Sequence, residues 1–385
     1  MQNKTQVIQP TRTPLDVQAI EHELSELWKQ NAGAARDDED GALLRTRVLN
    51  LLVYVPDEDE LSAVYEALDG VILEHPCRAL ILLAARDAVD KDIEAFVSSR
   101  CYLPAVAGGR HLCCEQVTLA AQGRYVEELP SAAAPLLVTD LPVFLWWRAA
   151  PRFDDEVFVN FCRQADRVIV DCGRSTRPHD DIGALAAFLR SDVGADVALS
   201  DLDWARLARW RAQVASFYDI REHREALARL NRVSIEYFAP DKAPGHLAPQ
   251  ALWLAGWLAS RLGWRPVAGP AETAGGARAA LLEKDGRRME VIFQAVERCD
   301  PMRGAILRIE LTAENHRPAI FAVSCSEDGR HLETSVSASK IGHTCVYEDT
   351  SEARLLARAL EVLSRDRVYE EAVIAAADLL AASGM

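Results

Sequence analysis

His75 and Arg78, in the stretch EHPCRALIL, are residue types that could bind an anion. An imidazole and a guanidinium at the start of an apolar, strand-like run could together hold a phosphate or a carboxylate. We favour the alternative that His75 and Pro76 form a turn, and that His75 and Arg78 pair with nearby backbone or carboxylate groups. Asp171 ends the run DRVIVDC, a position that binding residues take in α/β sheets, and a capping or solvated role fits it at least as well.

Short catalytic motifs are missing from the sequence. Neither G-x-G-x-x-G nor G-x-x-x-x-G-K-[ST] occurs, and the pairs Gly108–Gly109 and Gly275–Gly276 are typical of turns. The G-x-S-x-G elbow and the H-E-x-x-H pair are also absent. The sequence therefore gives no support to a nucleotide-dependent, hydrolytic or metalloprotease activity.

The nine cysteines are odd in number and show no C-x-x-C pair, so neither a zinc site nor a disulfide framework is indicated. Cys113 and Cys114 are adjacent, and in a strand their thiols would face opposite sides. Two separate, reduced cysteines are the favoured interpretation. The alternative is a redox switch, which would require an exposed thiolate with a depressed pKa.

Two segments rich in aromatic residues are better explained by packing in the core than by a functional site. In PLLVTDLPVFLWWRAAP, Pro142 suits the first position of a strand, and strand alternation would place Trp146 and Trp147 on opposite, buried faces. A buried indole N–H requires a hydrogen-bond partner, which gives these residues a structural role. Asp140, just before Pro142, is expected to cap the turn.

The segment DLDWARLARWRAQVASFYD has helical spacing and should mostly pack in the core. Trp204, Trp210 and Arg211 are nevertheless the residue types that anchor protein–protein interfaces. Part of this helix could therefore face a partner.

Composition describes a globular protein of 385 residues, 49% hydrophobic, with a formal net charge of -15. The acidic balance argues against nucleic-acid binding, which depends on clustered Lys and Arg. The polar N-terminal segment lacks the apolar core of a signal peptide, and no apolar run has the length of a membrane-spanning helix. We therefore expect a cytoplasmic protein with no nucleic-acid and no membrane partner.

The elements that position these residues follow from periodicity. Strand-like and helical runs alternate from Arg47 to Cys172, which predicts an α/β domain with a mostly parallel sheet. Strand-like runs after Arg278, separated by turn signals, predict an α+β domain with an antiparallel meander and two terminal helices that could cover one of its faces. The expected divisions are an N-terminal helix and flexible linker over 1–40, the α/β domain over 41–230 and the α+β domain over 231–385.

Six blocks occur in a specific order: RTRVLNLLVYV from Arg45, EHPCRALILLA from Glu74, CCEQVTLAAQG from Cys113, LPSAAAPLLVTDLPVFLWWRAAP from Leu129, DRVIVDC from Asp166 and DLDWARLARWRAQVASFYD from Asp201. With these blocks the chain resembles the OpcA family, the glucose-6-phosphate dehydrogenase assembly proteins. The block containing Pro142, Trp146 and Trp147 is the most specific of them and serves as a structural family motif.

The resemblance implies a non-enzymatic assembly factor and allosteric activator that binds glucose-6-phosphate dehydrogenase. Such a protein would support NADPH supply through the oxidative pentose phosphate pathway, with no catalytic residue, metal or cofactor of its own. The main alternative is a sugar-phosphate or nucleotide binding protein, or an unrecognised enzyme, with a crevice at the strand ends near His75, Arg78 and Asp171. A further alternative adds redox control by cysteine to the partner role.

Overall fold

The computed structural model describes residues 4–7, 10–37, 43–44, 47–72, 74–103, 111–239, 247–297, 304–314, 319–337, 339–347, 350–362 and 364–384. The chain forms two compact units. The first unit comprises Met1–Asp171, Ser191–Leu202 and Ser351–Arg365, and the second comprises Cys172–Arg190, Asp203–Thr350 and Asp366–Met385. The chain thus enters each unit more than once, which differs from the single boundary expected near residue 230.

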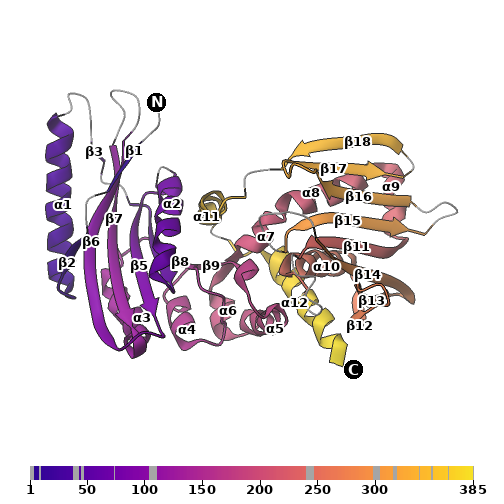
Figure 1. The fold of residues 1–385 in the computed structure, drawn as a ribbon, viewed down its shortest axis with the longest axis horizontal. Helices are drawn as coiled ribbons and strands as arrows, with labels where there is room; N and C mark the ends of the chain where they lie inside the picture. The colour runs from indigo at the N-terminus through magenta and orange to yellow at the C-terminus, as the bar shows by residue number, and fades with distance from the viewer. Residues whose placement is uncertain are drawn as a thin grey trace. The chain divides into compact units, whose positions relative to one another are not determined.

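A ten-stranded sheet forms the first unit (Figure 1). Its strands are β1 (Lys4–Val7), β2 (Thr11–Thr13), β3 (Leu43–Leu44), β4 (Leu49–Val55), β5 (Cys77–Ala85), β6 (Lys91–Leu103), β7 (His111–Gln122), β8 (Val143–Trp147), β9 (Arg167–Val170) and β10 (Ala198–Asp201). The strand order is β1-β6-β7-β5-β4-β8-β9-β10, with β2 beside β6 and β3 beside β7. All pairs from β7 to β10 are parallel, which confirms the predicted, mostly parallel sheet.

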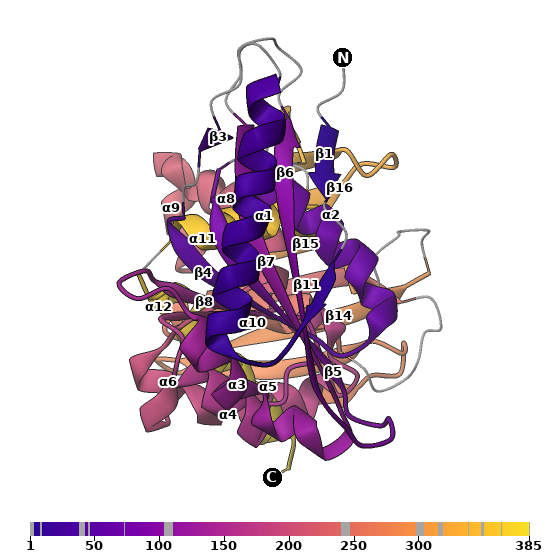
Figure 2. The same cartoon turned by 90° about the vertical axis from the view of Figure 1, so that its left-hand side faces the viewer.

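The strand order from β7 to β10 is that of doubly wound, Rossmann-like folds. Every residue of β4 is buried, as expected for a parallel strand that is covered on both faces. Figures 1 and 2 show α1 lying along one face of this sheet, and α2 lies on the other side of it in Figure 1. The helices of the unit are α1 (Val17–Asp37), α2 (Leu61–Val71), α3 (Leu129–Ala133), α4 (Glu156–Cys162), α6 (Asp192–Asp196) and α11 (Glu352–Glu361).

The second unit contains an eight-stranded sheet of order β12-β13-β14-β11-β15-β16-β17-β18. Its strands are β11 (Leu230–Phe238), β12 (Arg265–Glu272), β13 (Arg278–Lys284), β14 (Arg287–Val296), β15 (Ile306–Ala313), β16 (Ala319–Cys325), β17 (His331–Val336) and β18 (Ser339–Val346). The predicted antiparallel meander is present, with one parallel pair between β11 and β14. Burial alternates along β11 and β14, so that one face of the sheet is covered.

Helices of the second unit are α5 (Pro178–Leu189), α7 (Leu202–Arg206), α8 (Ala208–Ser216), α9 (Arg221–Leu227), α10 (Pro249–Leu262) and α12 (Arg367–Ala381). Helix α12 packs against α10, α5 and β12. Helix α10 ends at Gly263, whose φ of 72° is the left-handed conformation that commonly closes a helix. Among the residues that the structure describes, no helix has both the length and the apolar composition needed to cross a bilayer.

The terminal segments differ in detail from the expected divisions. A helix and a flexible linker were expected over 1–40, whereas β1 and β2 pair with β6 and α1 continues to Asp37. Residues 38–42 lie outside the described part of the chain. Of the two terminal helices that could have covered the meander, α11 packs against α2 in the first unit. Only α12 joins the second sheet.

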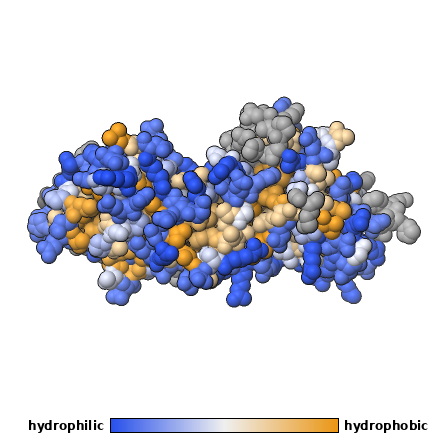
Figure 3. Space-filling view, turned by 90° about the horizontal axis from the view of Figure 1, so that it is seen from below, coloured by the Kyte–Doolittle hydropathy of each residue, from blue (hydrophilic) through white to orange (hydrophobic). Residues whose placement is uncertain are grey.

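The surface agrees with the acidic, polar composition. Hydrophilic residues predominate on the face drawn in Figure 3, and apolar patches lie between them.

Candidate functional site

The strand order of the first sheet reverses between β4 and β8. In doubly wound folds, ligands bind outside the carboxyl ends of the strands at such a point, and the turn after the first strand holds the phosphate. Here the residues after β4 are Pro56 and then the four acidic residues Asp57, Glu58, Asp59 and Glu60. The Asp57 carboxylate already accepts the Asp59 backbone N–H at 3.0 Å. This turn therefore offers negative charge where a dinucleotide-binding fold offers backbone donors.

Arg148 follows β8 on the other side of the same point. Its Nη2 lies 2.9 Å from Glu352 of α11 and 3.4 Å from Glu60, and its Nη1 donates to the Glu60 carbonyl at 3.3 Å. Its guanidinium also lies 5.0 Å from the centre of the Trp146 ring. The Arg148 side chain is only 4% exposed, so this cation is fixed by its partners. Sequence reasoning missed both Arg148 and Glu352, because their separation in the chain hides the contact.

Arg78 lies in the core of the first unit and is bound by carboxylates. It contacts Glu115 at 2.7 Å, donates to both carboxylate oxygens of Glu21, and reaches the Leu136 carbonyl at 3.0 Å. Burial lowers the pKa of Arg78, but the bonds and charges of Glu21 and Glu115 outweigh burial and raise it. Arg47 adds a second cation at 3.1 Å from Glu115. These contacts support the ion-pair interpretation of Arg78 over anion binding.

His75 is half-buried, and its Nε2 is buried without a hydrogen-bond partner in the described part of the chain. Glu74, His75 and Glu361 each offer a ligand atom, and the three atoms lie within 4.8 Å of one another. These residue types could hold a divalent cation. Arg354 lies 3.9 Å from Glu74 and already supplies positive charge at that carboxylate.

The block that contains Pro142, Trp146 and Trp147 lies in the hydrophobic core of the first unit. Pro142 directly precedes β8, and Trp146 and Trp147 are both buried, as predicted. Trp147 stacks on Tyr54 with ring centroids 3.7 Å apart and meets Phe158 edge to face. The expectation that each buried indole finds a partner was wrong for Trp147, whose Nε1 has none among the described residues.

Asp140 and Asp171 have different environments. Asp140 is exposed with φ of 64°, a left-handed conformation that Asp tolerates better than most residues. The turn before β8 is held by Asn50, which accepts the Val138 N–H at 2.8 Å and donates to the Val138 and Leu141 carbonyls. Asp171 is buried directly after β9.

The second aromatic cluster lies inside the second unit. Trp204 donates its Nε1–H to Asp366 at 2.9 Å, and Arg211 lies 3.4 Å from the centre of its ring. Burial lowers the pKa of Arg211 to about 10, and Asp366 partly opposes this shift. Trp210 is fully buried and meets Tyr347 edge to face. Because both tryptophans are buried, this structure gives no support to the interpretation that they anchor an interface with a partner.

The cysteine prediction was wrong for Cys113, which forms a disulfide with Cys101. The two residues face each other across the antiparallel pair of β6 and β7, a relationship that their 12-residue separation did not reveal. Cys114 is free and buried, and its sulfur accepts the Cys77 N–H at 3.3 Å. A separate hydrogen bond between the two thiol groups lowers the pKa of Cys114, and the same thiol–thiol bond together with burial raises the pKa of Cys77.

Comparison with known families matches most of the chain in two parts. Residues 69–187 match the glucose-6-phosphate dehydrogenase subunit N-terminal domain, and residues 197–373 match the corresponding C-terminal domain. The first match contains the tryptophan block, and the second contains the whole second sheet.

Relatives agree with this assignment, and a solved structure is similar in fold alone. Proteins named "Putative OxPP cycle protein OpcA" are 31% identical over 79% of this chain in Nostoc punctiforme and 26% identical over 87% in Synechocystis sp.. The alignments span 65% and 69% of those relatives' own length. A crystal structure of an NAD binding oxidoreductase from Klebsiella pneumoniae is similar in fold, with a TM-score of 0.50, 12% identity, and coverage of 88% of this chain and 97% of that one. With two domain matches of one family in sequence order, the chain belongs to the OpcA family, the glucose-6-phosphate dehydrogenase assembly family.

Proposed function

We propose that this chain is a non-catalytic partner of glucose-6-phosphate dehydrogenase. It would bind the enzyme, promote its active oligomer and thereby support NADPH supply through the oxidative pentose phosphate pathway. A protein that binds the active oligomer more tightly than the inactive form shifts the population toward the active one, by no more than that difference in affinity. Family membership supplies the partner in this proposal.

The proposal that the chain is not catalytic rests on the charged residues at the switch point between β4 and β8. Four acidic residues follow β4, and the Arg148 cation there is neutralised by Glu352 and Glu60. A pyrophosphate at this place would meet carboxylates instead of open backbone N–H groups. These contacts support the proposal that the chain has a Rossmann-like architecture without binding a dinucleotide at the switch point.

Steady-state kinetics of the cognate dehydrogenase tests the proposal. The enzyme is assayed as this chain is titrated in, and size-exclusion light scattering is run on the same mixtures. We expect a saturating rise in dehydrogenase activity and a larger complex that contains both proteins. Unchanged activity together with separate elution would contradict the partner role.

Calorimetric titration of NADPH into the chain alone tests the non-catalytic part. We expect no saturable heat, because the switch point is acidic. A variant with Glu58→Gln, Asp59→Asn and Glu60→Gln serves as the matched comparison, since it removes three of the four negative charges of the turn and keeps the side-chain size. Saturable NADPH binding by the unmodified chain would overturn this part of the proposal and favour an enzyme or nucleotide-binding protein.

A further inference from the structure

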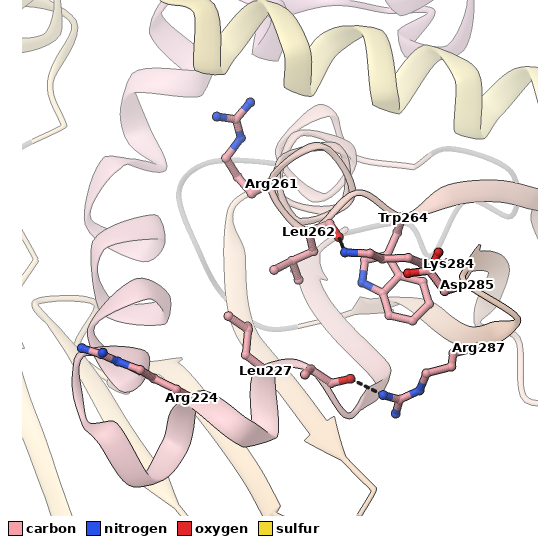
Figure 4. A pocket seen from close by; sticks show the side chains of 9 residues that line it. Arg224, Leu227, Arg261, Leu262, Trp264, Lys284, Asp285 and Arg287 are labelled. Carbon is pink, nitrogen blue, oxygen red and sulfur yellow. Dashed lines mark hydrogen bonds between the residues drawn. The ribbon is translucent and has the colours of Figure 1, made fainter.

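A cavity of about 430 Å³ lies within the second unit, between the ends of α9 and α10 and the turn that joins β13 to β14 (Figure 4). This volume is in the range of small-molecule sites. The residues that line it are Arg224, Leu227, Ala228, Arg261, Leu262, Trp264, Lys284, Asp285 and Arg287. Four of these side chains are cationic and one is anionic, on a chain whose net charge is -15.

Two of the cations face each other. Lys284 and Arg287 are direct cross-strand partners at the end of the β13–β14 hairpin. Asp285 and Gly286 form the turn between them, with φ of 50° and 76°. Side chains directly opposite in an antiparallel pair share one face of the sheet, and like charges in that arrangement repel. The hairpin therefore holds two positive charges on the same side, and Asp285 of the turn forms no ion pair with either of them in the described part of the chain.

Backbone carbonyls fix both cations in place. Lys284 Nζ donates to the Leu262 carbonyl at 2.7 Å, and Arg287 Nη1 donates to the Ala228 carbonyl. Figure 4 shows these two bonds, with the Trp264 ring and Leu262 close to the Lys284 side chain. The acceptors are neutral, so the bonds orient the side chains and leave their charges in place. Neither cation forms an ion pair with any carboxylate in the described ranges.

Helix capping explains part of this arrangement. Both carbonyls lie at helix C-terminal ends, where cations are favourable. Each helix end carries roughly half a negative charge, so the two ends together offset only about one cation. Arg224, whose hydrogen bonds also go to backbone carbonyls, adds a third cation beyond the one carboxylate of Asp285. The fourth cation, Arg261, is paired with Glu371. Capping therefore leaves an excess of positive charge at an open cavity.

We propose that this pocket binds the phosphate group of a small phosphate monoester between Lys284 and Arg287. Such a group carries close to two negative charges at neutral pH, which matches two facing cations. The Arg287 guanidinium retains further N–H groups that can bind phosphate oxygens in a fork, and Lys284 retains two donors. Leu227, Leu262 and Trp264 would contact the remainder of the ligand. This inference does not depend on the partner role proposed above.

Calorimetric titration of the full chain at low ionic strength tests the site, with inorganic phosphate, glucose 6-phosphate and AMP as probes. We expect saturable binding of all three in the unmodified chain. In Lys284→Gln and Arg287→Gln the affinity should fall about tenfold or more, the loss typical of a charge-assisted hydrogen bond. Tighter binding of glucose 6-phosphate than of the other probes would identify a sugar phosphate, tighter binding of AMP a nucleotide, and equal binding a site for the phosphate group alone.

Arg288→Gln is the matched control, because Arg288 is the exposed next residue of β14 and does not line the cavity. It makes the same change in net charge and should leave the affinity within twofold of the unmodified chain. Arg287→Lys keeps the charge and should lose less affinity than Arg287→Gln. Absence of binding to the unmodified chain, or equal losses in Arg288→Gln and Arg287→Gln, would overturn the proposal. Dehydrogenase activation by Arg287→Gln, measured in parallel, separates a failure of this site from a failure of the partner role.

Discussion

Arg148 and Glu352 lie 204 residues apart in sequence and form a 2.9 Å ion pair within the first unit. The pair attaches the first turn of α11 to the residue that follows β8. It uses the cation that would otherwise remain available at the switch point of the sheet. A late segment of the chain thus completes the first unit at the position where related folds hold a ligand.

Glu352→Gln should weaken the first unit. The substitution removes one charged partner of a cation that is 4% exposed, while Glu60 stays in contact. We expect the free energy of unfolding to fall by about 1–3 kcal/mol, as when a buried polar group loses a hydrogen-bond partner. Urea unfolding at neutral pH measures the change. Glu58→Gln, at an exposed residue of the acidic turn, is the control and should change stability by less than about 0.5 kcal/mol. Equal effects of the two substitutions would contradict the importance of the pair.

The disulfide between Cys101 and Cys113 should contribute measurably to stability. It closes a loop with a sequence separation of 12, for which the loss of chain entropy in the unfolded state corresponds to about 3 kcal/mol. Urea unfolding with and without dithiothreitol should therefore differ for the unmodified chain and coincide for a Cys101→Ser, Cys113→Ser double variant. Cys345→Ser, at a free cysteine, should retain the full sensitivity to reduction. A double variant that still responds to dithiothreitol would place the sensitivity elsewhere.

Much of the architecture is predictable because local pattern and tertiary environment agree. The runs that became β4 and β5 are mostly apolar, which suits strands covered on both faces. The block around Trp146 follows a proline and alternates between two buried faces, as a strand requires. In these places each residue's type and its final surroundings point to the same structure.

Such local patterns do not predict which segments that are distant in the sequence will contact one another. Helix α11 is amphipathic and could cover any apolar surface, and only its contacts with α2 and Arg148 in the folded chain show where it packs. Cys101 and Cys113 become neighbours only once β6 and β7 pair. In the sequence, Lys284 and Arg287 look like ordinary surface charges. Only the folded chain places them beside two helix ends at the edge of a cavity.

The ionisation of Tyr54 should make stability depend on alkaline pH. Burial raises the pKa of Tyr54 above its ordinary value of 10.0, and the hydrogen bond from Arg86 opposes this only in part. A raised folded-state pKa means that the unfolded chain loses the proton first. The Tyr54 contribution is then fully present below about pH 10 and is lost as the pH rises further.

Tyr54→Phe tests this dependence because it removes the titrating group and keeps the ring that stacks on Trp147. The difference in unfolding free energy between the unmodified chain and the variant should be constant from pH 7 to about pH 9, and should move in favour of the variant above about pH 10. Urea unfolding at intervals across this range measures it. A difference that stays constant to the alkaline limit would contradict the raised pKa.

Trp147→Phe and Trp204→Phe should lower the free energy of unfolding by different amounts, although both remove the same atoms from a buried site. Trp147 has no hydrogen-bond partner for its Nε1 among the described residues, so its substitution loses packing alone. Trp204 donates to Asp366, and its substitution also leaves a carboxylate without that donor. We expect Trp204→Phe to cost about 1.5–3 kcal/mol more, the range for hydrogen bonds to charged groups.

A double-mutant cycle of Trp204→Phe with Asp366→Asn isolates that bond from the packing term. Asparagine can still accept the Tyr369 N–H that Asp366 accepts at 3.0 Å, so the start of α12 keeps its cap. Urea unfolding of the four proteins should give a coupling free energy of about 1 kcal/mol or more, since only the charged form of the acceptor strengthens the indole bond. A coupling free energy near zero would show that Trp204 stabilises the fold by packing alone, as Trp147 does. The hydrogen bond to Asp366 would then make no contribution to stability.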